Sequence, residues 1–165
     1  MFEEIIDVGV SKFNIEDVYY QKFCNKYEKE ETTKASRNVF QFDWQRFVWA
    51  FVLGIYVEKR TPLTNKTKNP PFGKEVFDRR PKILKTMIGL VMQEIYKDNP
   101  DKLKEDFEES YDNGENLGKQ LKVAIEEYAN TGFNILELRS KDKPGYIENL
   151  EYVIEDILSD KGWTW

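Results

Sequence analysis

The residues with the clearest chemical character are basic, and they lie close together in the sequence between positions 59 and 85. This stretch holds nine basic residues and two acidic ones, although the formal net charge of the whole chain is −5. Eight of them are our candidate binding residues: Lys59, Arg60, Lys66, Lys68, Lys74, Arg79, Arg80 and Lys82. Lys and Arg side chains bind phosphate groups by displacing counterions, and they also attract acidic protein surfaces. The stretch predicts one of two things. It is either the binding site of an anionic partner, which is a nucleic acid or an acidic protein, or a loop whose charges face water or pair with the acidic remainder of the chain.

Acidic residues dominate a second stretch, in which eight of them lie between Asp98 and Glu115. Carboxylates at this density could bind a divalent cation. Their spacing does not fit a calcium-binding loop, because the Asn113-Gly114 turn is not preceded by alternating oxygen ligands. We interpret this stretch as the solvated face of a helix.

Catalytic chemistry has little support in the sequence. The chain contains no histidine, which removes the commonest general base and the usual ligand of zinc and iron. Glu137-Leu138-Arg139 is the nearest approach to the Glu-x-Lys pattern of metal-dependent nucleases, but Arg stands in the place of Lys and the neighbours are typical of a core. Cys24 has no second cysteine or histidine to work with and is interpreted as a small, half-buried side chain. We therefore predict that the chain is not an enzyme and that it has no catalytic residue, metal site or cofactor.

The elements that position these residues are predicted to be helices. The run from Val39 to Val57 is almost continuously apolar and aromatic after Phe47, so a helix at about residues 43–58 must be enclosed by other elements on every face. A membrane-spanning helix needs roughly 20 mostly apolar residues, and this run is interrupted near its start by Asp43 and Arg46. We predict a central core helix and no contact with a membrane.

Amphipathic repeats predict the remaining helices. Apolar side chains recur every three or four residues in stretches that begin near positions 14, 81, 100, 117 and 147. Gly132 either ends the fourth of these helices or, if that helix continues, lets a neighbouring helix approach closely. Pro and Asn residues between the core helix and Pro81 predict a long basic loop at about 59–80. The predicted fold is an all-α single domain, residues 1–165, in which five or six helices form a bundle around residues 43–58.

The remaining features concern the compartment and the two ends of the sequence. Cys24 is the only cysteine, so an intramolecular disulfide is excluded, and the first residues lack the pattern of a secretory signal. These observations predict a cytoplasmic protein. Residues 1–10 fit neither the helix nor the strand period, and Trp163 and Trp165 either fold back onto the core or anchor a partner.

Two parts of the chain, residues 39–63 and 126–158, carry a recognisable pattern. The first, VFQFDWQRFVWAFVLGIYVEKRTPL, is an apolar helix with a Gly near its end, followed by basic residues and Thr-Pro-Leu. The second contains EEYANTGFNIL, with a Tyr-Ala-Asn-x-Gly pattern, and ENLEYVIEDIL. Together these segments resemble a family of small bacterial proteins that are encoded beside DNA phosphorothioation (Dnd) and other anti-phage defence genes.

The resemblance implies an accessory role in a defence complex, with protein partners from the same operon, and it supplies no active-site residues. Two functions therefore compete: an interaction subunit of a defence assembly, and a module that binds DNA or RNA through residues 59–85. The net charge of −5 favours the first, because it repels a polyanion at long range. The local excess of positive charge keeps the second open at short range.

Overall fold

The computed structural model describes residues 13–24, 40, 42–67, 74–113 and 116–146, together with 152, 155 and 159. Regular structure in these ranges is helical, which confirms the predicted all-α class, and it is accompanied by one isolated β-bridge between Glu16 and Lys66. The helices are α2 (Asp17–Tyr19), the π-helix η1 (Tyr20–Cys24), α4 (Asp43–Tyr56), α5 (Lys74–Asp78), α6 (Pro81–Tyr96), α7 (Pro100–Asn113) and α8 (Asn116–Asp142). None of the helices in the described ranges is long and apolar enough to cross a membrane.

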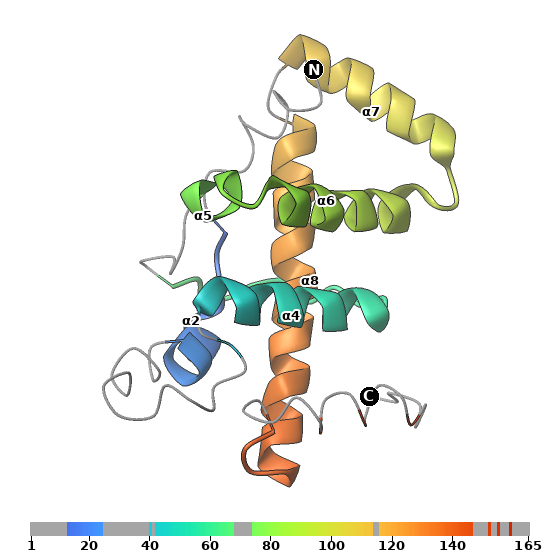
Figure 1. The fold of residues 1–165 in the computed structure, drawn as a ribbon. Coiled ribbons are helices and arrows are strands. Elements are labelled where there is room, and N and C mark those ends of the chain that lie inside the picture. Colours follow the sequence, from blue (N-terminus) through green and yellow to red (C-terminus); the bar gives the residue numbers. More distant parts are fainter. Residues whose placement is uncertain are drawn as a thin grey trace.

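The long helix α8 is the axis of this arrangement. Its 27 residues span about 40 Å. Figure 1 shows α4 and α6 running across α8, and α7 returning from the end of α6 toward the beginning of α8. The predicted core helix is thus present at its expected position, and its main packing partner is α8.

The helix ends follow from local sequence chemistry. At the start of α4, the backbone N–H of Phe42 donates to the side-chain oxygen of Gln45 at 3.0 Å. Pro81 occupies the first turn of α6, where a missing N–H costs nothing because that group would have no partner within the helix. At the start of α8, the backbone N–H of Leu117 donates to the buried hydroxyl of Ser110 at 3.0 Å, which ties α8 to the preceding α7.

Two glycines bring α4 and α8 into backbone contact. A Cβ atom added to Gly54 of α4 would overlap the backbone carbonyl of Tyr128 on α8, and one added to Gly132 of α8 would overlap the backbone carbonyl of Ala50 on α4. Ala50 and Gly54 lie one turn apart on α4, as do Tyr128 and Gly132 on α8, so the two contacts lie next to each other at one crossing. The helix does continue through Gly132, so the second of the two predicted roles of this glycine is confirmed.

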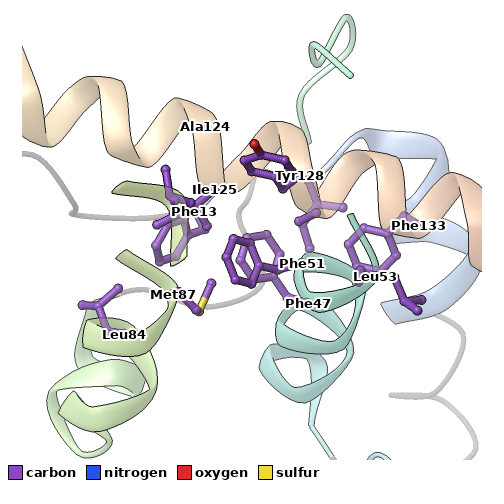
Figure 2. Close-up of a cluster of buried hydrophobic side chains, with 14 of the residues drawn as sticks. Phe13, Phe47, Phe51, Leu53, Leu84, Met87, Ala124, Ile125, Tyr128 and Phe133 are labelled. Carbon is purple, nitrogen blue, oxygen red and sulfur yellow. The ribbon is translucent and has the colours of Figure 1, made fainter. Parts of the chain in front are cut away.

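The core lies where α4, α6 and α8 meet (Figure 2). Phe51 of α4 packs edge-on against Tyr128 of α8, with ring centroids 6.3 Å apart. Phe13 enters from the N-terminal side, and its ring centroid lies 5.2 Å from that of Phe47 and 5.5 Å from that of Phe77. These aromatic contacts join α4 and α5 to a segment that is more than 30 residues away in the sequence.

Some sequence-based expectations differ from the structure or lie beyond it. The stretch predicted as a loop at about 59–80 contains the short helix α5, and Cys24 is fully rather than half buried. Residues 1–10, Trp163 and Trp165 lie outside the described residues, as does nearly all of the helix predicted near 147–158.

Candidate functional site

The first half of the predicted basic segment, residues 59–67, is held against α8 by a set of hydrogen bonds. The side-chain amide of Asn130 donates to the carbonyl oxygens of Thr61 at 3.1 Å and Pro62 at 3.2 Å. The hydroxyls of Thr61 and Thr131 share a further hydrogen bond of 2.9 Å. The Asn of the Tyr-Ala-Asn-x-Gly pattern therefore hydrogen-bonds to the backbone of the Thr-Pro-Leu pattern.

The other side of this segment is held by residues near α2. The Glu16 carboxylate accepts hydrogen bonds from the backbone N–H of Thr64 at 2.9 Å and of Asn65 at 2.7 Å, and from the Thr64 hydroxyl at 2.9 Å. The backbone N–H of Thr67 donates to the carbonyl of Ile15 at 2.9 Å. Residues 59–67 are consequently an ordered strap between α2 and α8, and we refer to them below as the strap.

A buried carboxylate lies beneath the strap. The Glu126 side chain is only 2% exposed, and its Oε1 accepts from the backbone N–H of Asn14 at 2.7 Å and from the Asn14 side-chain amide at 2.9 Å. The Lys122 ammonium lies 3.7 Å from the same oxygen. Burial raises the pKa of Glu126 above its ordinary value, while the bonds from Asn14 and the charges of Lys122 and Lys66 act in the opposite direction.

The three basic side chains of the strap are exposed, and two of them, Arg60 and Lys66, lie near carboxylates of α8. The Arg60 guanidinium pairs with the Glu127 carboxylate, with Nε at 2.8 Å and Nη2 at 2.6 Å from Oε2. Lys66 lies within the electrostatic influence of Glu126. Arg60 therefore pairs with the acidic remainder of the chain, as one of the two interpretations predicted. Lys59 is exposed just after the end of α4.

A second basic group forms the junction between α5 and α6. Arg79 and Lys82 are exposed there. The Arg80 guanidinium lies 4.6 Å from the centre of the Trp44 ring, and its Nη1 donates to the carbonyl of Val76 at 3.3 Å. We call Arg79, Arg80 and Lys82 the basic junction. Of the two other predicted residues, Lys74 begins α5 but its side chain is not described, and Lys68 lies outside the described residues.

Helix α4 separates Lys59 and Arg60 from the basic junction. Arg80 stacks on Trp44 in the first turn of α4, while the backbone N–H of Lys59 donates to the carbonyl of Gly54 near its last turn, at 3.3 Å. A helix rises 1.5 Å per residue, so these two ends are on the order of 15 Å apart. The structure thus does not gather all the predicted basic residues into one surface.

An apolar groove adjoins the basic junction. It has a volume of about 260 Å³ and lies between α4 and α6. Its lining consists of Val48, Phe51, Val52, Lys82, Ile83, Thr86, Met87 and Leu90. Lys82 belongs both to this lining and to the basic junction, so charge and apolar surface are continuous here.

The groove corrects the expectation that α4 is enclosed on every face. Val52 is 37% exposed and Tyr56 is 48% exposed. Sequence reasoning missed the groove because it depends on α6 lying beside α4. The available signal was the apolar stripe Val48, Val52 and Tyr56 at four-residue spacing, opposite the stripe that contains Gly54.

The nuclease-like sequence forms part of an ion-pair cluster instead. The Lys22 ammonium donates to Glu137 Oε1 at 2.9 Å, and the Lys141 ammonium lies 3.6 Å from the same atom. The hydrogen bond from Lys22 lowers the pKa of Glu137 below its ordinary value. Within the described part of the chain, no three His, Cys, Asp or Glu side chains are grouped so that they could hold a metal ion.

Comparison with known proteins places the chain in a family. Searches among curated proteins and among solved structures found no significant match. One family model matches residues 25–161, and this range includes the strap, the basic junction and the groove. Because the match covers most of the sequence, the chain belongs to this family, which is described as DNA sulphur modification system-associated protein 4.

Proposed function

We propose that this protein is a non-catalytic accessory subunit that binds another protein of a DNA sulphur modification system. Its family membership supports the association with such a system. The observation that carries the proposal is the basic junction, where Arg79 and Lys82 are exposed beside an open apolar groove. Contiguous apolar surface with a charged rim is typical of protein interaction sites.

The distribution of the basic residues favours a protein over a nucleic acid as the partner. A nucleic acid presents phosphates at regular short intervals and rewards several cations along one track. Here Arg60 is engaged with Glu127, and α4 separates it from the basic junction. The net charge of −5 also opposes the approach of a polyanion.

The non-catalytic part of the proposal is supported by the state of Glu126 and Glu137, the two carboxylates among the described residues whose pKa values are shifted. Glu126 is buried and accepts two hydrogen bonds from Asn14, and Glu137 pairs with Lys22 and Lys141. Both carboxylates thus have partners within the chain. The chain also lacks histidine, which is the commonest general base.

Co-purification tests the proposal. The tagged protein is expressed together with the products of neighbouring genes, and the charge-reversal variant Arg79→Glu/Lys82→Glu is compared with the wild type. We expect a specific neighbouring protein to co-purify with the wild type and to be lost from the variant. The matched control is Lys102→Glu/Lys104→Glu, which makes the same charge change on the exposed face of α7 and should retain the partner. Retention by both variants would contradict the proposed surface.

The alternative function, nucleic-acid binding, is tested on the isolated protein. Fluorescence anisotropy with labelled DNA and RNA is measured over a series of salt concentrations. We expect no salt-sensitive binding at micromolar protein concentrations. Binding that weakens steeply with salt and disappears in Arg79→Glu/Lys82→Glu would contradict the proposed interaction subunit. It would instead support a nucleic-acid-binding module.

A further inference from the structure

Helices α4 and α6 each contribute to both the floor and the walls of the groove, which differ in burial. Phe51 and Met87 form the floor and are buried in the core, and Figure 2 shows the Met87 side chain pointing from α6 toward Phe51. Val48 and Val52 form the α4 wall, and Ile83 and Leu90 form much of the α6 wall. Six of the eight lining residues are apolar, so an occupant must present apolar side chains.

The dimensions of the groove suit a few side chains of an α-helix. At about 260 Å³ it is smaller than most small-molecule pockets, which measure roughly 300–1,000 Å³. Ile83 and Leu90 are seven residues apart on α6, which corresponds to about 10 Å along the helix axis. Residues i and i+7 of a bound helix have the same separation, and binding of an amphipathic helix in an apolar groove uses this spacing.

The charges at the two ends of α6 give the occupant a polarity. Around the start of α6, Arg79, Arg80 and Lys82 outnumber Asp78, and the helix terminus adds a partial positive charge. Near the last turn, one ammonium, that of Lys97, is shared by Glu94 and Glu58, each at 2.9 Å. Acidic side chains of an occupant are therefore favoured at the end where α6 begins.

The chain's own C-terminal segment is also acidic and apolar by sequence, and it is therefore a competing occupant. However, Tyr152 lies near Lys143, with the ammonium 5.5 Å from the ring centre. Lys143 follows the last residue of α8, about 15 Å along the axis from Gly132, where α4 crosses. This position favours an occupant from another protein.

We propose that the groove between α4 and α6 binds one amphipathic α-helix of a partner protein, with apolar side chains on Phe51 and Met87 and acidic side chains beside Arg79 and Lys82. This inference rests on the proposed function and specifies the partner's chemistry. It excludes a small-molecule ligand and a nucleic acid as the occupant of this groove.

Peptide binding to the full-length protein tests this inference. The probes are fluorescently labelled peptides of about 15 residues, roughly four helical turns, that tile the proteins encoded beside this gene. A further peptide covers residues 147–160 of the chain itself. We expect the strongest binders to be amphipathic, with apolar residues at i, i+3 or i+4 and i+7 and with acidic residues toward one end.

Variants of the groove identify where the peptides bind. Val52→Glu places a carboxylate in the apolar wall and should weaken the strongest peptide at least about tenfold. Arg79→Glu/Lys82→Glu should weaken the same peptide and reduce its salt dependence. The matched control is Val123→Glu, which introduces the same residue at an exposed position of α8 outside the groove and should leave binding unchanged. Circular dichroism confirms that each variant is folded.

The outcomes separate this inference from the proposed function. The inference is overturned if no peptide binds, if Val52→Glu binds as well as the wild type, or if the peptide of residues 147–160 binds most tightly, which would indicate a second copy of this chain. The proposed function survives these results if Arg79→Glu/Lys82→Glu still abolishes co-purification. The proposed function itself is contradicted if no neighbouring protein co-purifies with the wild type.

Discussion

The two faces of α4 are both apolar, yet they are used in opposite ways. The face toward α8 is closed so tightly that Gly54 touches the backbone of Tyr128. The face beside α6 leaves Val52 37% exposed at the edge of a groove. One helix thus provides both a backbone-to-backbone contact and a partly exposed apolar surface.

The difference arises from side-chain size along the two stripes of α4. Ala50 and Gly54 are small, so the backbone of α8 approaches without a gap. Val48 and Val52 are larger, so α6 meets this side through side chains and a groove remains. Small residues therefore allow α4 to pack closely against α8, and larger ones leave the groove that we propose as the binding surface.

A large effect is predicted for filling the α4–α8 crossing. Gly54→Ala or Gly132→Ala should reduce the free energy of unfolding by about 3 kcal/mol or more, because the added methyl group meets backbone that no rotamer change can move. Urea denaturation followed by circular dichroism measures this loss. Gly89→Ala is the matched control, since a Cβ atom at this position of α6 meets nothing within 4 Å.

The control should move in the opposite direction. Ala has a higher helix propensity than Gly by up to about 1 kcal/mol, so Gly89→Ala should be neutral or stabilising. If Gly54→Ala behaved like Gly89→Ala, the two helices would not be in backbone contact, and the contrast between the faces of α4 would disappear.

The second prediction compares Phe51 and Val52, which are adjacent in the sequence and both line the groove but differ in burial. Phe51 is fully buried, so Phe51→Ala should cost about 3–5 kcal/mol of unfolding free energy. Val52→Ala should change it by about 0.5 kcal/mol or less, because the side chain is partly exposed and has no hydrogen-bonding role. Thermal and urea unfolding measure both. Similar losses for the two variants would show that the groove is part of the core and is unsuited to a partner.

Much of the fold was predictable because helix ends and periods are local properties. Pro81 and the pair Asn99-Pro100 mark the beginnings of α6 and α7, and the core helix predicted at about 43–58 is α4, Asp43–Tyr56. Gly132 left two interpretations, because the local pattern is the same whether a second helix approaches or the first one ends. Only the position of Ala50 on another helix decides between them.

The candidate site was less predictable because it depends on contacts between distant segments. The charge count identified Arg79 and Lys82 as well as Arg60, but it could not show that Arg60 pairs with Glu127, which is 67 residues away. The groove was missed for the same reason. Periodicity shows that α4 has apolar residues on all sides, and it cannot show which side a neighbouring helix leaves uncovered.

A third prediction concerns the strap. Asn130→Ala removes the donor to the carbonyl oxygens of Thr61 and Pro62, and it should cost about 1–3 kcal/mol because these acceptors lose a partly buried partner. Hydrogen exchange should rise selectively in residues 59–67. Asn134→Ala, at an exposed position one turn further along α8, is the control and should leave both quantities unchanged. A uniform rise in exchange throughout the chain would indicate global destabilisation instead of release of the strap.

The smallest predicted effect concerns the charge of Glu126. Burial raises the pKa of this carboxyl in the folded state, so its contribution to stability is fully present below the unfolded pKa, about 4.3, and is lost as the pH rises through the folded pKa. Glu126→Gln keeps an oxygen that can accept from Asn14 but carries no charge. At neutral pH the variant should therefore be at least as stable as the wild type, and this advantage should shrink as the pH falls toward 4. Urea denaturation of both proteins across this range measures the difference. A variant that is less stable than the wild type at neutral pH would show that attraction to Lys122 and Lys66 outweighs the cost of burying the carboxylate.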